Sequence, residues 1–500
     1  MPQLDICGAL EGQTILITGG TGFLGKVLTE KLLRTCNVKH IYILIREKKG
    51  KSINERINAI LEDPLFSILS ADKPKFRQKI STMSGDCGLP GLGLSLEDRQ
   101  KIIDEVSVIF HGAATLKFDE DLKIAHTINI KGTKQMLDLA KEVKHLKTFV
   151  HISTAYTNCH LNKIEEKIYE PPMDEERLQQ MVENMDDELI KAILPKILGK
   201  WPNTYAFTKA MAEFVASKYV KELPLVIFRP GVVVGTYQEP VIGWTDNLYG
   251  PTGIVVGAGC GLLHSLHADI ECTANLVPVD MTVAALIASA AEKIESEKHD
   301  LPIYNYVSCT DNPLLWREFK RLIEKHGDEV PTIRAVWCYF MTIHKLWITH
   351  FLCVIFLHYI PAIIMDGIGF LTRSKNPSLY KVYKKIDKHS DVLSYFSFRS
   401  WEFANDSVKT LWSRLSPDDK INFNFDINSL DWDRFFYNYI RGLRFYLLKD
   451  EWSTLPQATI KWNRFKLAHK CIKIGLLLLC LKMVWTIATT TYSLIDSKAF

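Results

Sequence analysis

The chain lacks the cysteine spacing of a metal or disulfide protein, and it lacks a strong charge of either sign. Its 11 cysteines are scattered over 500 residues with no Cys-x-x-Cys pair, which indicates reduced intracellular thiols and predicts no metal site. The formal net charge of +4 is too small to favour nucleic acid as a partner. The start of the chain carries Asp5 and Glu11 and no long apolar run, so we expect no signal peptide.

What the sequence does contain is a run of three glycines at every third position, between an apolar stretch and helix-forming residues. Strand, tight turn and helix in this order are typical of a dinucleotide-binding βαβ unit, although a glycine turn also occurs in other α/β proteins. The glycines permit a positive φ and a close approach of backbone to pyrophosphate, and the helix N-terminus offers free N–H groups. The predicted cofactor-binding residues of this turn are Gly19, Thr21, Gly22, Phe23, Leu24 and Gly25.

A second apolar strand ends at Arg46, where a dinucleotide-binding fold contacts the adenosine ribose. Arginine at this place favours a 2′-phosphate, and Lys48 and Lys49 follow it, so we predict NADPH. Glu47 leaves an alternative, because an acidic residue facing the ribose weakens that preference. Arg56, on the helix that follows, is predicted to reach back to the phosphate.

Further polar or small residues follow the later strands of the predicted sheet. Asp86, with Cys87 beside it, is placed to bind the adenine. The small residues Ala113 and Ala114 leave room for the cofactor at the end of the fourth strand. Asn129, in the next helix, is expected to face the strand ends.

Alternating strands and helices over the first two thirds of the chain predict a doubly wound parallel Rossmann sheet. Residues 162–200 are expected to form an inserted loop and helix, and the glycine-rich stretch 243–263 to be loop-rich and to line the substrate site. We expect a reductase domain over 1–334 with its substrate part at about 236–334. A helical C-terminal domain over 335–450 and a basic linker with an apolar tail anchor over 451–500 complete the predicted organisation.

The predicted catalytic group combines a helix with a strand end. Tyr205 and Lys209 are spaced i, i+4 and therefore share one face of a helix, and Ser153 and Thr154 follow the fifth strand. A Tyr-x-x-x-Lys spacing alone usually means only a helix face, but its combination with the glycine turn and the hydroxyls is specific. Lys209 is expected to lower the pKa of the phenol, so that Tyr205 donates a proton while hydride arrives from the cofactor.

These motifs resemble those of the extended short-chain dehydrogenases/reductases and, more narrowly, the fatty acyl-CoA reductases. The matching pieces are Thr18–Gly25, Leu44–Arg46, Gly85-Asp86, His151–Ala155, Pro202–Tyr205 with Lys209, Arg229-Pro230, Gly243–Pro251 and Leu276–Asp280. The resemblance covers nearly the whole chain and implies NADPH-dependent reduction of a long-chain fatty acyl-CoA, through an aldehyde, to a primary alcohol and free CoA.

The same resemblance implies roles for single residues. Tyr205 is the proton donor, Lys209 tunes its pKa and anchors the ribose, and Thr154 is favoured over Ser153 for holding the carbonyl. Pro230, Val232 and Val233 are implied to lie against the nicotinamide. A hydroxysteroid or nucleotide-sugar reductase, an aldehyde-releasing reductase, and a non-catalytic membrane scaffold that senses NADP(H) are the alternatives, and a homodimer stays open.

Two apolar stretches in the last third predict contact with a lipid bilayer. The stretch 346–364 is nearly long enough to span a membrane, although a buried helix or an acyl-chain channel is the alternative. The stretch 474–495 is apolar apart from Lys482 and several hydroxyls. Four basic residues precede it and only Lys498 follows, so the reductase domain is expected to face the cytosol. The final Ser-Lys-Ala-Phe is not a peroxisomal matrix signal, which leaves the membrane of the endoplasmic reticulum or the peroxisome.

Overall fold

A seven-stranded parallel sheet forms the centre of the computed structural model, which describes residues 3–47, 50–296, 298, 300–372 and 378–496. The strand order is β11-β7-β5-β4-β1-β2-β3, so the chain starts in the middle and winds outward in both directions. This order confirms the predicted doubly wound Rossmann sheet. The strands are β1 (Thr14–Thr18), β2 (His40–Ile45), β3 (Ile80–Ser84), β4 (Val108–His111), β5 (Thr148–Ile152), β7 (Leu225–Pro230) and β11 (Ile303–Tyr306).

Both faces of the sheet are covered, because successive strand residues point to opposite sides. In β1, Ile15 and Ile17 belong to the apolar core on one face, while Leu16 belongs to the core on the other. The helices of the first face are α1 (Ile6–Leu10), α2 (Phe23–Thr35), α3 (Ile53–Leu61), α4 (Ser67–Asp72) and α12 (Val279–Glu295). The helices of the second face are α5 (Leu96–Glu105), α7 (Gly132–Glu142) and α10 (Thr204–Ser217).

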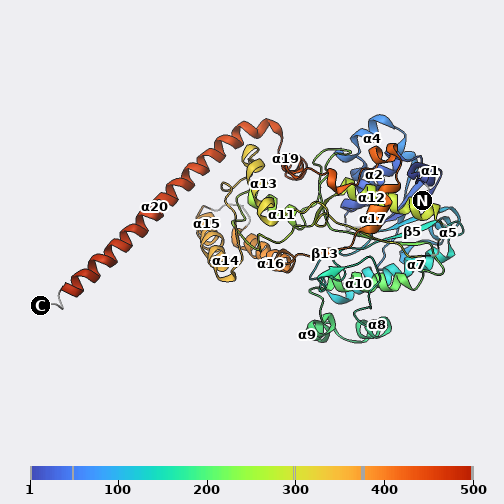
Figure 1. Ribbon diagram of the computed structural model, residues 1–500, viewed down its shortest axis with the longest axis horizontal. Coiled ribbons are helices and arrows are strands. Elements are labelled where there is room, and N and C mark those ends of the chain that lie inside the picture. The colour runs from blue at the N-terminus through green and yellow to red at the C-terminus, as the bar shows by residue number, and fades with distance from the viewer. Residues whose placement is uncertain (1–2, 48–49, 297, 299, 373–377, 497–500) are drawn as a thin grey trace.

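Short elements connect the strands and helices of the sheet. The turn before α7 consists of α6 (Leu122–Ala125) and the π-helical turn η4 (His126–Lys131). The inserted stretch forms two helices, α8 (Glu175–Asn184) and α9 (Asp187–Leu198), which lie beyond α10 at one edge of the molecule (Figure 1). The remaining short helices of this part are η1 (Pro64–Phe66), η2 (Phe76–Lys79) and η3 (Pro90–Gly93).

The region after β7 is less loop-rich than its glycine content predicts. Helix α11 (Pro251–Gly259) occupies part of the stretch expected to be loop, since Pro251 suits its first turn and its apolar residues are buried. Two-stranded parallel pairs join β8 (Val232–Val234) to β10 (Leu276–Pro278) and β9 (Ser265–His267) to β12 (Thr342–His344). Helix α13 (Trp316–Glu329) follows β11.

The C-terminal region packs directly on the reductase domain. Strand β13 (Glu402–Phe403) pairs with β6 (Lys163–Ile164), and Phe423 and Phe425 share one apolar core with the sheet. Most of this region is helical, as predicted. Its elements are α14 (Trp347–Cys353), η5 (Val354–Tyr359), α15 (Ile360–Leu371), α16 (Leu379–Ser397), α17 (Asp406–Arg414), α18 (Pro417–Asn422), η6 (Ile427–Ser429), α19 (Trp432–Gly442), η7 (Leu443–Leu447) and η8 (Trp452–Thr454).

Helix α20 (Leu455–Asp496) projects away from the folded body as a single long rod (Figure 1). Within the described residues, two helical segments are long and apolar enough to cross a membrane, Trp347–Leu371 and Trp452–Tyr492. The more apolar part of the second segment has no buried residues, which is the pattern of a helix that lacks a protein partner. Lys498 lies outside the described residues.

Candidate active site

The glycine turn between β1 and α2 has the shape that a pyrophosphate requires. Gly19 has φ of +75°, and a Cβ there would meet the backbone of Gly112 at 2.8 Å. A Cβ on Gly25 would lie 2.4 Å from the carbonyl oxygen of Gly19. No side chain of the described residues caps the N-terminus of α2, so its N–H groups remain available to an anion. Thr21, Phe23 and Leu24 are half-buried around this turn.

The end of β2 brings together the two arginines predicted to bind the ribose phosphate. Arg46 is exposed just after the strand, and the Arg56 guanidinium on α3 donates a hydrogen bond to the Arg46 carbonyl. Arg56 therefore does reach back to the strand end. Lys48 and Lys49 lie outside the described residues.

The strands beside β1 bring the next predicted residues close to the turn. The backbone N–H of Ala113 donates to the Thr18 hydroxyl at 3.2 Å, which places Ala113 and Ala114 beside the glycines. Asp86 follows β3 and accepts the Gly88 N–H at 2.9 Å, while Cys87 is buried next to it.

Asn129 lies on the π-helical turn η4 and links two parts of the site. Its amide oxygen accepts the backbone N–H of Thr115 at 2.9 Å, and its amide nitrogen donates to the Thr208 hydroxyl at 3.0 Å. Thr208 directly precedes Lys209 on α10. Asn129 thus holds the loop after β4 against the helix that carries Tyr205 and Lys209.

The structure brings Tyr205, Thr154 and Lys209 together at the carboxyl ends of the central strands. The Thr154 hydroxyl lies close enough to the Tyr205 phenol to act on its pKa. Lys209 is buried one helical turn further along α10, and its ammonium donates to the carbonyl oxygen of Ile152 at 2.7 Å. An ammonium has three donors, and the bond to Ile152 is the one that Lys209 makes within the described part of the chain, which leaves donors for sugar hydroxyls.

Burial governs the proton affinities of this group. It raises the pKa of Tyr205 to about 12, although the nearby Thr154 hydroxyl acts in the opposite direction. It lowers the pKa of Lys209 to about 8. In the chain alone the pKa of the phenol is therefore raised and not lowered, because desolvation of a buried phenolate prevails. That Lys209 and the bound nicotinamide together lower this pKa stays a prediction. A phenol that keeps its proton at neutral pH suits a proton donor.

Ser153 faces a buried ion pair. Its hydroxyl donates to Glu213 at 2.5 Å, and Glu213 pairs with Arg229 at 2.7 Å. Both charged side chains are almost fully buried. Glu213 lies one turn after Lys209 on α10, and Arg229 lies on β7. The ion pair therefore holds α10 against the sheet. Thr154 is therefore the hydroxyl next to the phenol.

The end of β7 supplies the wall opposite the glycine turn. The carbonyl oxygen of Pro230 accepts the N–H of Ala155 at 2.9 Å, which places Pro230 next to the strand end that carries Thr154. Val232 and Val233 follow on β8 and are half-buried. That these residues contact the nicotinamide, as the resemblance implies, stays a prediction.

Aromatic residues that the sequence did not indicate cover Tyr205. The ring centroid of Phe118 lies 5.5 Å from that of Tyr205 and 5.4 Å from that of Phe396 on α16. Phe118 follows β4, whereas Phe396 comes from the C-terminal region. Glu213 was missed as well, and its i+4 spacing from Lys209 was the signal that could have identified it.

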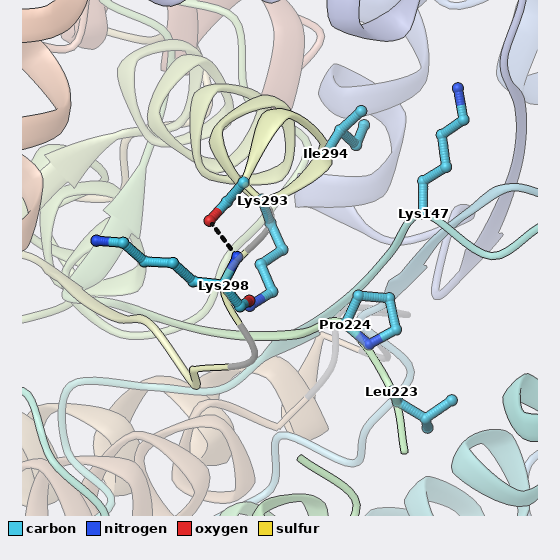
Figure 2. A pocket seen from close by; sticks show the side chains of 7 residues that line it. Lys147, Leu223, Pro224, Lys293, Ile294 and Lys298 are labelled. Atoms are coloured by element: carbon cyan, nitrogen blue, oxygen red, sulfur yellow. Dashed lines mark hydrogen bonds between the residues drawn. The ribbon is translucent and has the colours of Figure 1, made fainter. Parts of the chain in front are cut away.

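The pocket shown in Figure 2 lies at the wrong edge of the sheet for this chemistry. Lys147 and Pro224 line it, and each directly precedes a strand, so the pocket is at the amino ends of β5 and β7. Tyr205, Thr154 and Lys209 are at the carboxyl ends of the strands. The amine of Lys293, also in the lining, donates to the carbonyl oxygen of Lys298 at 2.8 Å.

A doubly wound parallel sheet with a glycine turn after its first strand defines the class of Rossmann-type dinucleotide-binding proteins. The reductase domain of a nonribosomal peptide synthetase from Mycobacterium tuberculosis shares the fold, with a TM-score of 0.59 at 17% identity over 88% of this chain and 94% of that one. Residues 17–286 and 357–450 match two family profiles, both described as male sterility protein.

Two curated relatives narrow the class. The chain is 42% identical to fatty acyl-CoA reductase wat of Drosophila melanogaster, over 91% of this chain and 88% of the relative. It is 37% identical to fatty acyl-CoA reductase 1 of Rattus norvegicus, over 95% and 92% of the two chains. The chain belongs to the fatty acyl-CoA reductase family and is an oxidoreductase.

Proposed function

We propose that this enzyme reduces a long-chain fatty acyl-CoA to a primary alcohol and free CoA, at the expense of two NADPH. The observation that carries the proposal is the convergence of the Tyr205 phenol, the Thr154 hydroxyl and the Lys209 ammonium at the carboxyl edge of the sheet. Both relatives described above are named fatty acyl-CoA reductases, which supports the substrate class.

The side chains have separate tasks in both reductions. Thr154 and Tyr205 hold the carbonyl oxygen of the thioester, and Lys209 orients the ribose. The cofactor supplies hydride to the carbonyl carbon. Tyr205 gives its proton to the carbonyl oxygen. As the C–S bond breaks and the C=O bond forms again, the hydroxyl passes its proton to the sulfur, which leaves as the thiol of CoA, and a proton from solvent restores Tyr205. The aldehyde that remains takes a second hydride and a second proton at the same place, which completes the alcohol.

Counting NADPH against CoA tests this proposal directly. Full-length protein given NADPH and a long-chain acyl-CoA should consume two NADPH for each CoA released, since the acyl carbon gains four electrons. The measurement combines absorbance of NADPH with a thiol reagent, and gas chromatography identifies the product. One NADPH per CoA, with accumulating aldehyde, would mean that the reaction stops halfway, and indifference to acyl-CoA would favour another carbonyl substrate.

The choice of NADPH over NADH rests on Arg46 and Arg56 at the end of β2. Arg46→Ala should raise the KM for NADPH about 10- to 100-fold, because a charge-assisted bond to a phosphate contributes about 1.5–3 kcal/mol. The KM for NADH should stay nearly unchanged. Initial rates with each cofactor check this, with Arg317→Ala as the control because Arg317 is an exposed arginine paired with Glu271. Equal effects on both cofactors would contradict the assignment.

The proposed location is an intracellular membrane, that of the endoplasmic reticulum or the peroxisome, with the reductase domain in the cytosol. The exposed apolar part of α20 would span the bilayer. Lys470 and Lys473 directly precede this part and are exposed, which suits the cytosolic side.

A further inference from the structure

The helical segment formed by α14, η5 and α15 has two unlike faces along its whole length. Its outer face carries thirteen large apolar side chains between residues 346 and 371, each at least 40% exposed. Its inner face is a stripe of buried or half-buried residues at every fourth position, namely His350, Val354, His358, Ala362 and Asp366. The segment therefore has one exposed apolar face and one face packed against the protein, although its sequence is almost uniformly apolar.

The inner stripe fastens the segment to the folded body at its start, middle and end. His350 shares a hydrogen bond of 2.7 Å with Ser265. His358 accepts the backbone N–H of His264 at 3.0 Å. Asp366 accepts hydrogen bonds of 2.7 and 2.8 Å from the start of α16. A helix that stood across a bilayer would have to break all three attachments, and two of them are made to residues beside β9 in the reductase domain.

The outer face is too large and too apolar for an ordinary water-exposed surface. Thirteen side chains of this kind, about half exposed, present on the order of 1,000 Å² of apolar area, whereas the largest apolar patch of a typical monomer is about 300–600 Å². No charged residue occurs from 346 to 365. Trp347 stacks on Phe351 at 4.8 Å near the start of the segment, as aromatic residues commonly do at a membrane surface.

The inner stripe lies close to the point where α20 leaves the protein. The ring of His469 on α20 lies 4.5 Å from that of Phe340, measured between centroids. Phe340 stacks on His264 at 4.1 Å, and His264 lies 5.7 Å from His358 of η5. From residue 470 onward α20 has no buried residue among those whose exposure is described. The point where α20 detaches is therefore separated from η5 by only two aromatic rings.

We propose that α14, η5 and α15 lie in the plane of one bilayer leaflet, with their outer face among the lipid chains, while α20 alone crosses the membrane. The attachment of the inner stripe excludes a spanning orientation, and the exit of α20 beside η5 places the segment at headgroup depth. A helix with one apolar face and one protein-bound face suits this interfacial position. The exposed Lys381 and Lys384 of the neighbouring α16 suit anionic headgroups.

Helix α16 connects this surface to the candidate active site. Helix α16 begins at the bonds to Asp366 and ends next to Phe396, whose ring lies against Phe118 above Tyr205. One helix of 19 residues, about 28 Å long, therefore connects the membrane contact to the catalytic phenol. The in-plane segment holds the active site at a fixed height above the leaflet that contains long-chain lipids.

Depth-dependent quenching on the full chain tests the orientation. An environment-sensitive fluorescent amino acid is placed by amber-codon suppression at Phe356 or Ile364, both exposed on the outer face, and the protein is reconstituted in phosphatidylcholine–phosphatidylserine vesicles. Lipids carrying a nitroxide near the headgroup should quench both positions more strongly than lipids carrying it at the bilayer centre. The same label at Leu478 of α20 should show the opposite order.

Each other outcome has a distinct meaning. Stronger quenching from the bilayer centre at Phe356 would overturn the in-plane orientation in favour of a spanning helix. A blue-shifted label at Phe356 that neither nitroxide quenches would overturn it in favour of burial against a second copy of the chain. Quenching at Phe356 without quenching at Leu478 would contradict the α20 anchor and leave the in-plane contact standing. Ile421, 79% exposed on α18, serves as the unquenched control.

Discussion

Tyr205→Phe is expected to lower kcat for acyl-CoA reduction about 10³-fold, which corresponds to about 4 kcal/mol of transition-state stabilisation. The substitution removes only the phenol oxygen, so the ring keeps its contact with Phe118 at 5.5 Å. Without that oxygen the substrate carbonyl loses its proton donor, whereas Thr154 keeps its hydrogen bond from the Tyr156 N–H. NADPH oxidation at saturating acyl-CoA measures the loss, and energy transfer from tryptophan to NADPH measures cofactor binding, which should be nearly unchanged.

Tyr437→Phe is the matched control, because Tyr437 is a tyrosine of α19 with 43% of its surface exposed. Its activity should equal that of the unaltered protein. If Tyr205→Phe kept more than about a tenth of kcat, general acid catalysis by the phenol would be refuted. A non-catalytic scaffold would lose nothing in either variant, so the pair of variants separates an enzyme from a cofactor sensor.

Local patterns in the sequence were enough to predict the sheet and the centre of the site. The glycine spacing after β1 needs only neighbouring residues, and the confirmed doubly wound parallel sheet follows from the alternation of strands and helices. Tyr205 and Lys209 were placed together because an i, i+4 spacing puts both on one helix face. Thr154 was predicted to lie near these two residues because parallel strands end at a common edge of the sheet.

What the sequence did not predict depends on contacts between distant segments. Phe118 and Phe396 belong to different parts of the chain and meet only because α16 packs beside the loop after β4. Glu213 looks like a surface charge on a helix until Arg229 is found opposite it on β7. The raised pKa of Tyr205 in the chain alone was not predicted, because the nearby charge is visible in the sequence whereas the degree of burial is not.

The two histidines of the apolar segment are a further case in which contacts with distant residues could not be predicted from the sequence. His350 and His358 weaken an apparent membrane span when only composition is counted. In the structure both point inward, where Ser265 and His264 bind them, and they explain why the segment has a protein-facing side. Polar residues at a spacing of eight were a signal of that side, but their partners lie more than 80 residues away.

Gly25→Ala is expected to weaken NADPH binding about 10²- to 10⁴-fold, because two charge-assisted bonds of about 1.5–3 kcal/mol each are lost when the turn opens. The added Cβ would lie 2.4 Å from the Gly19 carbonyl oxygen and 2.6 Å from the Gly20 Cα, and neither backbone atom can rotate away as a side chain would. To relieve this clash, the backbone of Gly19 and Gly20 must move away from the start of α2, and the N–H groups of the turn and of the helix can then no longer bind one pyrophosphate together. Titration of NADPH by fluorescence measures the affinity, and circular dichroism shows whether the protein remains folded.

Gly327→Ala provides the comparison that isolates this steric effect. Gly327 lies within α13, and a Cβ there would have no neighbour within 4 Å. The same change of one methyl group should leave NADPH affinity unaltered and stabilise the helix by up to about 1 kcal/mol. Unchanged NADPH affinity in a folded Gly25→Ala protein would show that the pyrophosphate does not bind at this turn. The position of a nicotinamide next to Tyr205 depends on pyrophosphate binding at this turn. The assignment of Tyr205 as the proton donor would then be wrong as well.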